Sequence, residues 1–282
     1  MTIAAGLRPA ATGSTAFGSA ASRFRDVVVF TRRNLVHVRR EPAQLSDVTI
    51  QPVLFTILFI YIFGSGIPIR GGSYKDFALA GLLTLNLTTS AMGTAVGLST
   101  DMTTGAIDRF RALPIWRAAV LVGRTMSDLL AALLCSIIVG LTGLVIGWRA
   151  DATLLSVLAG FGVALLFSFA LTWGCACLGM VSKGPESAQG IGLIVLFPLA
   201  FVSNAMVPTT GMPHWLQLIA DWNPVSAVTA ACRDLFGNPN PSGSIDVWPM
   251  RHPVEAAIGW SLLILLVCAP LAVHLFRRRT TE

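Results

Sequence analysis

Charged side chains are scarce in this sequence: they make up 12% of its 282 residues, against 54% hydrophobic residues, and the mean hydropathy is +0.71. Soluble globular domains carry about 25% charged residues, so this composition excludes an ordinary soluble fold. A membrane-spanning helix needs about 20 apolar residues. Six stretches without any charge reach that length: Val48–Ile69, Phe77–Thr100, Leu129–Trp148, Ala152–Ser182, Ser187–Ala220 and Ala256–Phe276.

These six stretches also lack the alternation of apolar and polar residues that membrane β-barrels show. In lipid, backbone groups must find partners within the protein, which leaves helices as the alternative to a closed barrel. The sequence therefore predicts an all-α integral membrane protein with six transmembrane helices. The spacings Gly93-x-x-x-Gly97 and Gly143-x-x-x-Gly147 would permit close helix approach within it.

The five cysteines and four histidines show no spacing typical of a metal site or a disulfide framework. Cys175 and Cys177 are two residues apart, so on a helix they would point about 200° away from each other. A cysteine within an apolar stretch usually acts as a small core residue. We therefore expect no bound metal.

A phosphate-binding loop of the form G-x-x-x-x-G-K-[ST] is absent, so we do not expect this chain to bind ATP in that way. The interiors of the apolar stretches hold no Asp, Glu, Lys or Arg, which disfavours an ion-coupled efflux carrier. They also show no catalytic cluster, so we expect a protein that is not an enzyme. A non-transport membrane scaffold or assembly protein stays open as an alternative to a transporter subunit.

The net charge of +6 comes from basic residues on one side of the predicted membrane domain. They precede the first stretch, separate the second from the third, and follow the sixth. Cytoplasmic loops are enriched in Lys and Arg, so we expect a multi-pass plasma-membrane protein with both termini in the cytoplasm, and no nucleic-acid partner. The opposite loops would hold only Arg70, Lys75, Arg149, Arg233 and Arg251.

The chain is predicted to begin with two segments outside the six-span domain of residues 42–282. Residues 1–22 read as a disordered cytoplasmic tail. Residues 23–41 form an amphipathic pattern that Pro42 ends. This helix would lie on anionic lipid, dock a cytoplasmic partner, or do both. Its basic face consists of Arg25, Arg32, Arg33, Arg39 and Arg40.

Residues 101–124 form a basic loop between the second and third stretches. We expect Asp101 to cap the start of a short helix, Gly105 to allow close backbone contact, and Pro114 to turn the chain. An ordinary solvated loop would not need an apolar residue such as Phe110 beside its charges. We therefore interpret the loop as a mechanical coupling element that a partner binds, with a solvated loop as the alternative.

A second special region, residues 208–253, follows the fifth stretch. Pro208 and Pro213 interrupt the apolar run, and Asn223-Pro224 has the pattern of a new helix start. The segment predicts an external hairpin of two short helices, the second of which ends near Gly237 and is followed by a loop.

Two segments resemble a known family. DMTTGAIDRFRALPIWRAAVLVGR is similar to the cytoplasmic loop of type-2 ABC exporter permeases, especially their daunorubicin-resistance (DrrB-type) branch. Residues 197–236 resemble the fifth span and outer hairpin of the same family. The resemblance covers roughly residues 23–279. The family often carries Glu and a Gly-Thr pair where this chain has Asp101, Asp108 and Gly105-Ala106.

The resemblance implies a permease that exports amphipathic or hydrophobic compounds, such as drugs, antibiotics or lipid-like molecules. Such a permease dimerises within membrane lipid and binds two copies of a separate ABC ATPase, which holds ATP and Mg, so that this chain needs no cofactor of its own. The segment 23–41 matches the connecting helix. The implied coupling helix comprises Asp101, Gly105, Asp108, Arg109, Phe110, Arg111 and Pro114.

In such exporters, spans two and five line the substrate path. This nominates four polar residues as walls of the path, with interhelical hydrogen bonding as the alternative role for each. They are Asn86, Thr89, Ser203 and Asn204.

Overall fold

The computed structural model describes residues 25, 27–32, 34, 42–64, 66–67, 69, 72–105, 118–241 and 246–279. The described residues between 25 and 34 are helical, and we call them the N-terminal helix. The other elements are, in chain order, α2 (Pro42–Phe63), α3 (Tyr74–Ser90), α4 (Met92–Thr103), α6 (Ala118–Ile146), α7 (Leu154–Val181), α8 (Pro185–Phe201), the 3-10 turn η1 (Thr209–Gly211), α9 (His214–Trp222), α10 (Pro224–Phe236), α11 (Trp248–Arg251) and α12 (Pro253–Arg279).

Four helical segments in the described ranges are long and apolar enough to cross a membrane. They are α6, α7, α12 and the combined segment Tyr74–Thr103, which α3 and α4 form together. The apolar parts of α2 and α8 are shorter. All regular elements described here are helices, so the prediction of an all-α membrane protein is confirmed, while the count of six spans stays a prediction.

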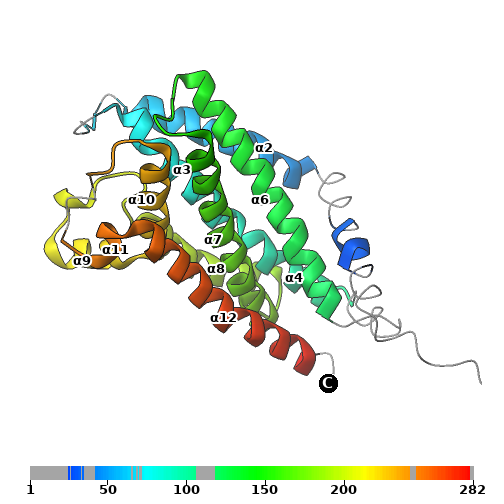
Figure 1. Ribbon diagram of the computed structural model, residues 1–282. Helices are drawn as coiled ribbons and strands as arrows, with labels where there is room; N and C mark the ends of the chain where they lie inside the picture. Colours follow the sequence, from blue (N-terminus) through cyan, green and yellow to red (C-terminus); the bar gives the residue numbers. More distant parts are fainter. Residues whose placement is uncertain are drawn as a thin grey trace, which may run out of the picture.

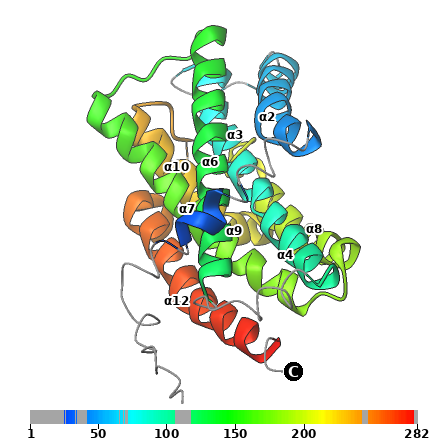
Figure 2. The same cartoon turned by 90° about the vertical axis from the view of Figure 1, so that its right-hand side faces the viewer.

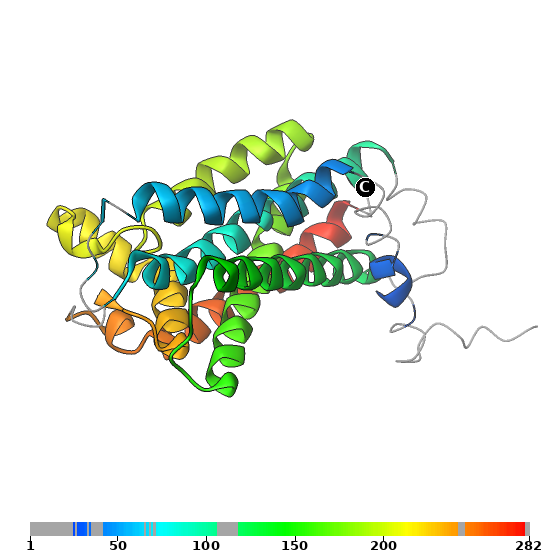
Figure 3. The same cartoon turned by 90° about the horizontal axis from the view of Figure 1, so that it is seen from above.

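The long helices pack around α7, which contacts α12, α4, α10 and α6 (Figure 1). Helix α2 lies against α6 and α3, and it borders the same long side of the bundle as α8 (Figures 2 and 3). The short helices α9, α10 and α11 gather at one end, which we call the hairpin end (Figure 1). The opposite end holds the N-terminal helix, the start of α6 and the end of α12, and we call this the loop end (Figure 1).

The second predicted span is one helical segment with a break at Ala91. Before the break, polar side chains bond carbonyl groups of their own helix, as Asn86 does with Leu82 (2.8 Å) and Ser90 with Leu87 (2.9 Å). Such bonds satisfy polar side chains in an apolar environment. They also compete with the backbone hydrogen bonds of the helix and often bend it. The amide of Thr94 bonds Ala91 in a tighter, three-residue turn (3.1 Å). The break therefore separates α3 from α4 without leaving the apolar segment.

The loop predicted over residues 101–124 is shorter in the structure. Asp101 lies in the last turn of α4, so the prediction that it caps the start of a helix is wrong. Residues 118–124 belong to α6, which extends the third predicted span well before Leu129. The charge-free run marked only the apolar part of this helix, because Arg124 and Asp128 pair four residues apart and are compatible with helix continuation.

Candidate functional site

Helix α4 ends in a glycine that turns the chain toward the loop. Gly105 follows the C-cap Thr104 and has a φ angle of 66°. Only glycine enters this left-handed region at little cost, so a side chain here would strain the exit from α4. Gly105 thus ends a helix, which is a more specific role than the close backbone contact predicted from the sequence.

Most of the predicted coupling helix lies outside the described residues. This applies to Asp108, Arg109, Phe110, Arg111 and Pro114. Their coupling role stays a prediction. What the structure defines is how the two ends of the loop are held, at Gly105 and at Ala118.

The N-terminal helix packs on α6 just after the loop. A Cβ atom placed on Gly123 would lie 2.5 Å from the Cβ of Phe30, so only a glycine allows this approach. The Thr31 hydroxyl donates to Val27 O (2.8 Å) and reaches Gly123 O (3.3 Å). Arg25 and Arg32 are exposed, whereas the side chains of the other three predicted face residues lie outside the described part: Arg33, Arg39 and Arg40.

Phe30 also joins a buried apolar cluster at the loop end. The cluster includes Leu98 from α4, Leu121 from α6, Met180 from α7 and Phe276 from α12. Phe30 is only 7% exposed and the other four are at most 3% exposed. The N-terminal helix is therefore connected to α4, α6, α7 and α12 by side chains in direct packing.

A polar cluster joins α4 to α6 deeper in the bundle. The Asp128 carboxylate accepts a hydrogen bond from the Thr94 hydroxyl (2.7 Å) and pairs with Arg124 Nε (3.4 Å). Arg124 Nη2 donates to Gly93 O (3.0 Å). The side chains of Arg124 and Asp128 are 21% and 20% exposed, so water weakens this pair less than it would a surface pair. Arg124, predicted in the loop, is thus part of a helix–helix contact.

The hairpin end is organised around Arg233, which sequence reasoning counted among loop charges that set topology. Its side chain is 0% exposed. It donates to Phe77 O (3.0 Å), Asn204 O (2.9 Å) and Ala205 O (3.0 Å), and its guanidinium carbon lies 3.6 Å from the centre of the Phe77 ring. Burial lowers the pKa of Arg233 to about 9, which leaves it protonated at neutral pH. One guanidinium therefore ties α10 to the start of α3 and to the segment after α8.

Two asparagines hold the same region together. Asn223 caps α10 by accepting from Val225 N (2.8 Å), and its amide group donates to Leu199 O (2.8 Å) at the end of α8. Asn238 accepts from Trp148 Nε1 (2.8 Å), so it links the hairpin to the end of α6. The predicted helix start at Asn223-Pro224 and the predicted end near Gly237 are both confirmed.

The four nominated path residues have different surroundings. Asn204 is 0% exposed and its backbone N–H donates to Ser226 Oγ (2.9 Å). Ser203 is 3% exposed and its hydroxyl donates to Ala200 O (2.6 Å). Asn86 is 7% exposed and bonds within α3. Burial of these three favours the structural alternative. Thr89 alone of the four is exposed.

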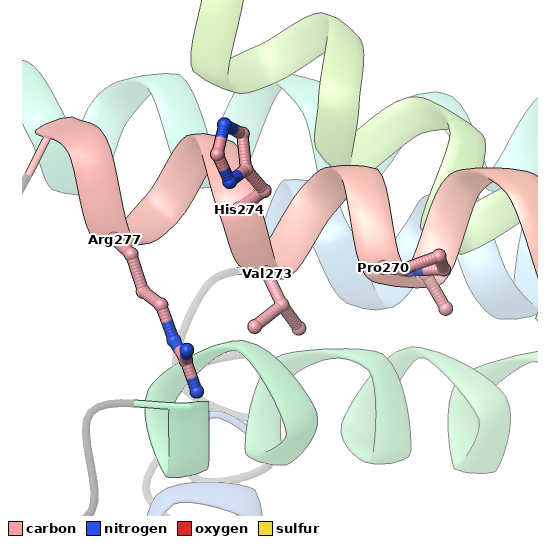
Figure 4. A pocket seen from close by; sticks show the side chains of 5 residues that line it. Pro270, Val273, His274 and Arg277 are labelled. Atoms are coloured by element: carbon pink, nitrogen blue, oxygen red, sulfur yellow. The ribbon is translucent and has the colours of Figure 1, made fainter.

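An open recess of about 480 Å³ lies beside α12 at the loop end. Val273 and Arg277 point to one side of α12 and His274 points to the other (Figure 4). The lining residues all come from α12 and do not converge on a common point (Figure 4), which differs from the concave site that a bound small molecule usually occupies. We assign no substrate site to it. The lining residues are Ala269, Pro270, Val273, His274 and Arg277.

Residues 25–236 match the family described as ABC-2 type transporter. This chain belongs to the ABC-2 type transporter family. The match extends from the N-terminal helix through the loop to the end of α10, so it includes segments from both ends of the bundle. The family predicted from the loop and from residues 197–236 is therefore confirmed.

Named relatives of this ABC-2 type transporter are permeases. It is 32% identical over 250 residues to the daunorubicin resistance ABC transporter permease protein DrrB1 of Streptomyces coeruleorubidus, which covers 89% of this chain and 85% of the relative. It is 24% identical over 254 residues to the probable doxorubicin resistance ABC transporter permease protein DrrC of Mycobacterium tuberculosis (89% and 88%). It is 27% identical over 222 residues to the putative transport permease ycf38 of Porphyra purpurea (76% and 75%).

Arg233 and the Arg124–Asp128 pair are the residues of this transporter that sequence reasoning missed. A signal for Arg233 was present, because Ser226, Thr229 and Arg233 recur at helical spacing and so share one face of α10. The spacing of Arg124 and Asp128 also fits a helical ion pair. Neither pattern indicates what the face contacts, which only the packing of distant segments decides.

Proposed function

We propose that this ABC-2 type transporter is the membrane subunit of an ATP-driven exporter for amphipathic or hydrophobic compounds. The observation that carries the proposal is the family match across residues 25–236. The names of two relatives refer to daunorubicin and doxorubicin resistance, which supports a drug as the exported compound. Because the sequence contains no phosphate loop, a separate ATPase subunit, in two copies, would bind ATP and Mg.

We propose six spans, with α2 and α8 as the first and fifth. Helix α2 has 22 residues, or about 33 Å, and α8 has 17 residues, or about 26 Å. These lengths lie on either side of the hydrocarbon thickness of about 30 Å. Both helices expose large apolar side chains, including Leu54 (58%) and Tyr61 (68%) on α2 and Ile194 (76%) and Phe197 (55%) on α8. Such faces suit lipid or a second copy of the permease, and the proposed homodimer would use part of them.

The loop end is proposed to face the cytoplasm. Arg25, Arg32, Arg277 and Arg278 are exposed there. The N-terminal helix and the end of α12 lie together at this end (Figure 1). An excess of basic residues at one end of a membrane bundle supports a cytoplasmic position for that end and for both termini.

Coupling would begin where the ATPase binds the loop and the N-terminal helix. Beside the exposed Arg25 and Arg32, this helix exposes Val28 (47%) and Val29 (59%). A mixed basic and apolar face of this kind suits a protein or an anionic lipid surface. Movement of the ATPase would then pass through Phe30 into the buried cluster and tilt the long helices.

The substrate path is proposed to run along the exposed side of α3, where Thr89 is the nominated residue that remains accessible. A few polar groups in an apolar wall can orient an amphipathic compound. Asn204 would shape this wall indirectly, because its backbone binds Arg233 and Ser226.

The proposal is tested by transport with a co-expressed ATPase of the same ABC system. Inside-out vesicles carrying both subunits should take up fluorescent amphipathic drugs when ATP is added. Vesicles with a hydrolysis-deficient ATPase are the control, since they keep the same proteins and the same lipid partitioning. ATP-independent distribution of every compound in a broad panel, despite a stable complex, would exclude export and favour the scaffold alternative.

A further inference from the structure

The α4–α6 clamp, defined as Gly93, Thr94, Gly97, Arg124 and Asp128, connects the two helices on either side of the coupling loop. Helix α4 leads into the loop and α6 leads out of it. Helix α4 packs chiefly on α7 and α8, whereas α6 packs chiefly on α2, α3 and α7. Both helices also contact α7, and Leu98 of α4 and Leu121 of α6 lie in the same apolar cluster. Because α4 and α6 contact each other directly over only a small area, a polar connection between them bears on whether the two ends of the loop move together.

The geometry of the clamp is specific. Arg124 uses Nε toward Asp128 and Nη2 toward Gly93 O (3.0 Å), so it connects its own helix to the backbone of α4. The Asp128 carboxylate in turn accepts a hydrogen bond from the Thr94 hydroxyl of α4 (2.7 Å). Each helix thus donates one hydrogen bond to the other, and two such bonds restrain α4 against sliding and rotating on α6.

Gly97 makes room for the clamp. A Cβ atom on Gly97 would lie 1.9 Å from Arg124 Nη2 and 2.3 Å from the guanidinium carbon. The Gly93-x-x-x-Gly97 spacing, which the sequence associates with close helix approach, here admits an arginine side chain across the face of α4. The clamp can therefore be broken without removing either charge.

We propose that Arg124 and Asp128 are positioning residues for coupling, which hold α4 and α6 together so that both ends of the loop move as one unit. This inference rests on the proposed exporter function. Without the clamp, movement of the loop would bend α4 relative to α6 near the break at Ala91. The conformational change of the ATPase would then deform the permease instead of opening the substrate path. ATP hydrolysis would then continue with little transport.

The test compares Asp128→Asn and Gly97→Ala with Asp246→Asn. Asp128→Asn removes the charge and keeps the shape, while Gly97→Ala displaces the guanidinium and keeps the pair of charges. Asp246 forms an ion pair with Arg251 at the hairpin end, but their side chains are 83% and 58% exposed, and exposed pairs contribute little. It therefore serves as the matched control. Arg124→Lys keeps the charge but presents a single ammonium group, so it should retain part of the wild-type coupling.

Transport per ATP hydrolysed should fall at least about tenfold in both clamp variants, a factor that corresponds to about 1.4 kcal/mol, and should be unchanged in the control. Co-purified ATPase and its hydrolysis rate should stay near wild type, which separates uncoupling from misfolding. In a cysteine-free background, spin labels at the exposed positions Thr100 and Leu130 should give a broader distance distribution in both variants.

Wild-type coupling and an unchanged distance distribution in both clamp variants would overturn the clamp while leaving the exporter intact. Loss of expression in one variant leaves the other to decide, because the two act on different helices. Absence of ATP-driven transport by the wild-type permease would instead count against the proposed function itself.

Discussion

Replacing Arg233 by methionine should destabilise the protein strongly, because three carbonyl groups depend on its guanidinium. Methionine fills a similar volume, but it donates no hydrogen bonds. The carbonyl oxygens of Phe77, Asn204 and Ala205 would lose their bonds to a charged donor (2.9–3.0 Å). Bonds to charged groups contribute about 1.5–3 kcal/mol each, although water that enters the site would replace some of them. We therefore expect a loss of about 3–6 kcal/mol.

A loss of this size is a large part of the total, since proteins are stable by only about 5–15 kcal/mol. For chains of about 150–250 residues, 1 kcal/mol shifts Tm by about 2–4 °C, so Arg233→Met should lower Tm by more than about 6 °C. Tryptophan fluorescence during heating of the detergent-purified permease measures this directly. Arg233→Lys, which keeps the charge but presents a single ammonium group, should lie between methionine and wild type.

The matched control is Arg251→Met, at the same end of the molecule. Arg251 is exposed and pairs with Asp246, so its loss should change Tm by less than about 2 °C. An Arg233→Met protein as stable as this control would refute the view that Arg233 organises the hairpin end. It would mean that the packing of α10 on α3 and α7 suffices without the guanidinium.

Three further predictions concern function. Asp108→Arg and Arg111→Glu should each weaken co-purification of the ATPase at least about tenfold, because charge reversal at a desolvated interface costs about 2–5 kcal/mol. The control Arg70→Glu, in the predicted opposite loop, should leave co-purification unchanged. Thr89→Leu should shift relative export rates among amphipathic drugs without changing ATPase binding, and an unchanged drug profile would remove Thr89 from the path. A cysteine at position 111 should react only with membrane-permeant reagents and one at position 210 also with impermeant reagents, whereas the reverse pattern would invert the topology.

The sequence by itself determined the class of fold, because lipid imposes a local requirement. Each long apolar run must satisfy its own backbone, so composition over about 20 residues is enough to predict a helix. Local chemistry also defined the hairpin end, where Asn223 caps α10 and Gly237 ends it with a φ angle of 70°. The family could be read from contiguous residues for the same reason, since the loop and residues 197–236 are each single segments.

Only the tertiary structure decided what Arg233 and Arg124 do. Arg233 looked like a topology charge, yet it is buried because Phe77, distant in sequence, and Asn204 bring carbonyl groups to it. Arg124 looked like a loop residue, yet it crosses α4 because Gly97 leaves space for it. The hydrophobicity of a segment can be read directly from its residues. The partner of a buried charge depends on which distant segments of the chain pack together, and the sequence alone does not show this.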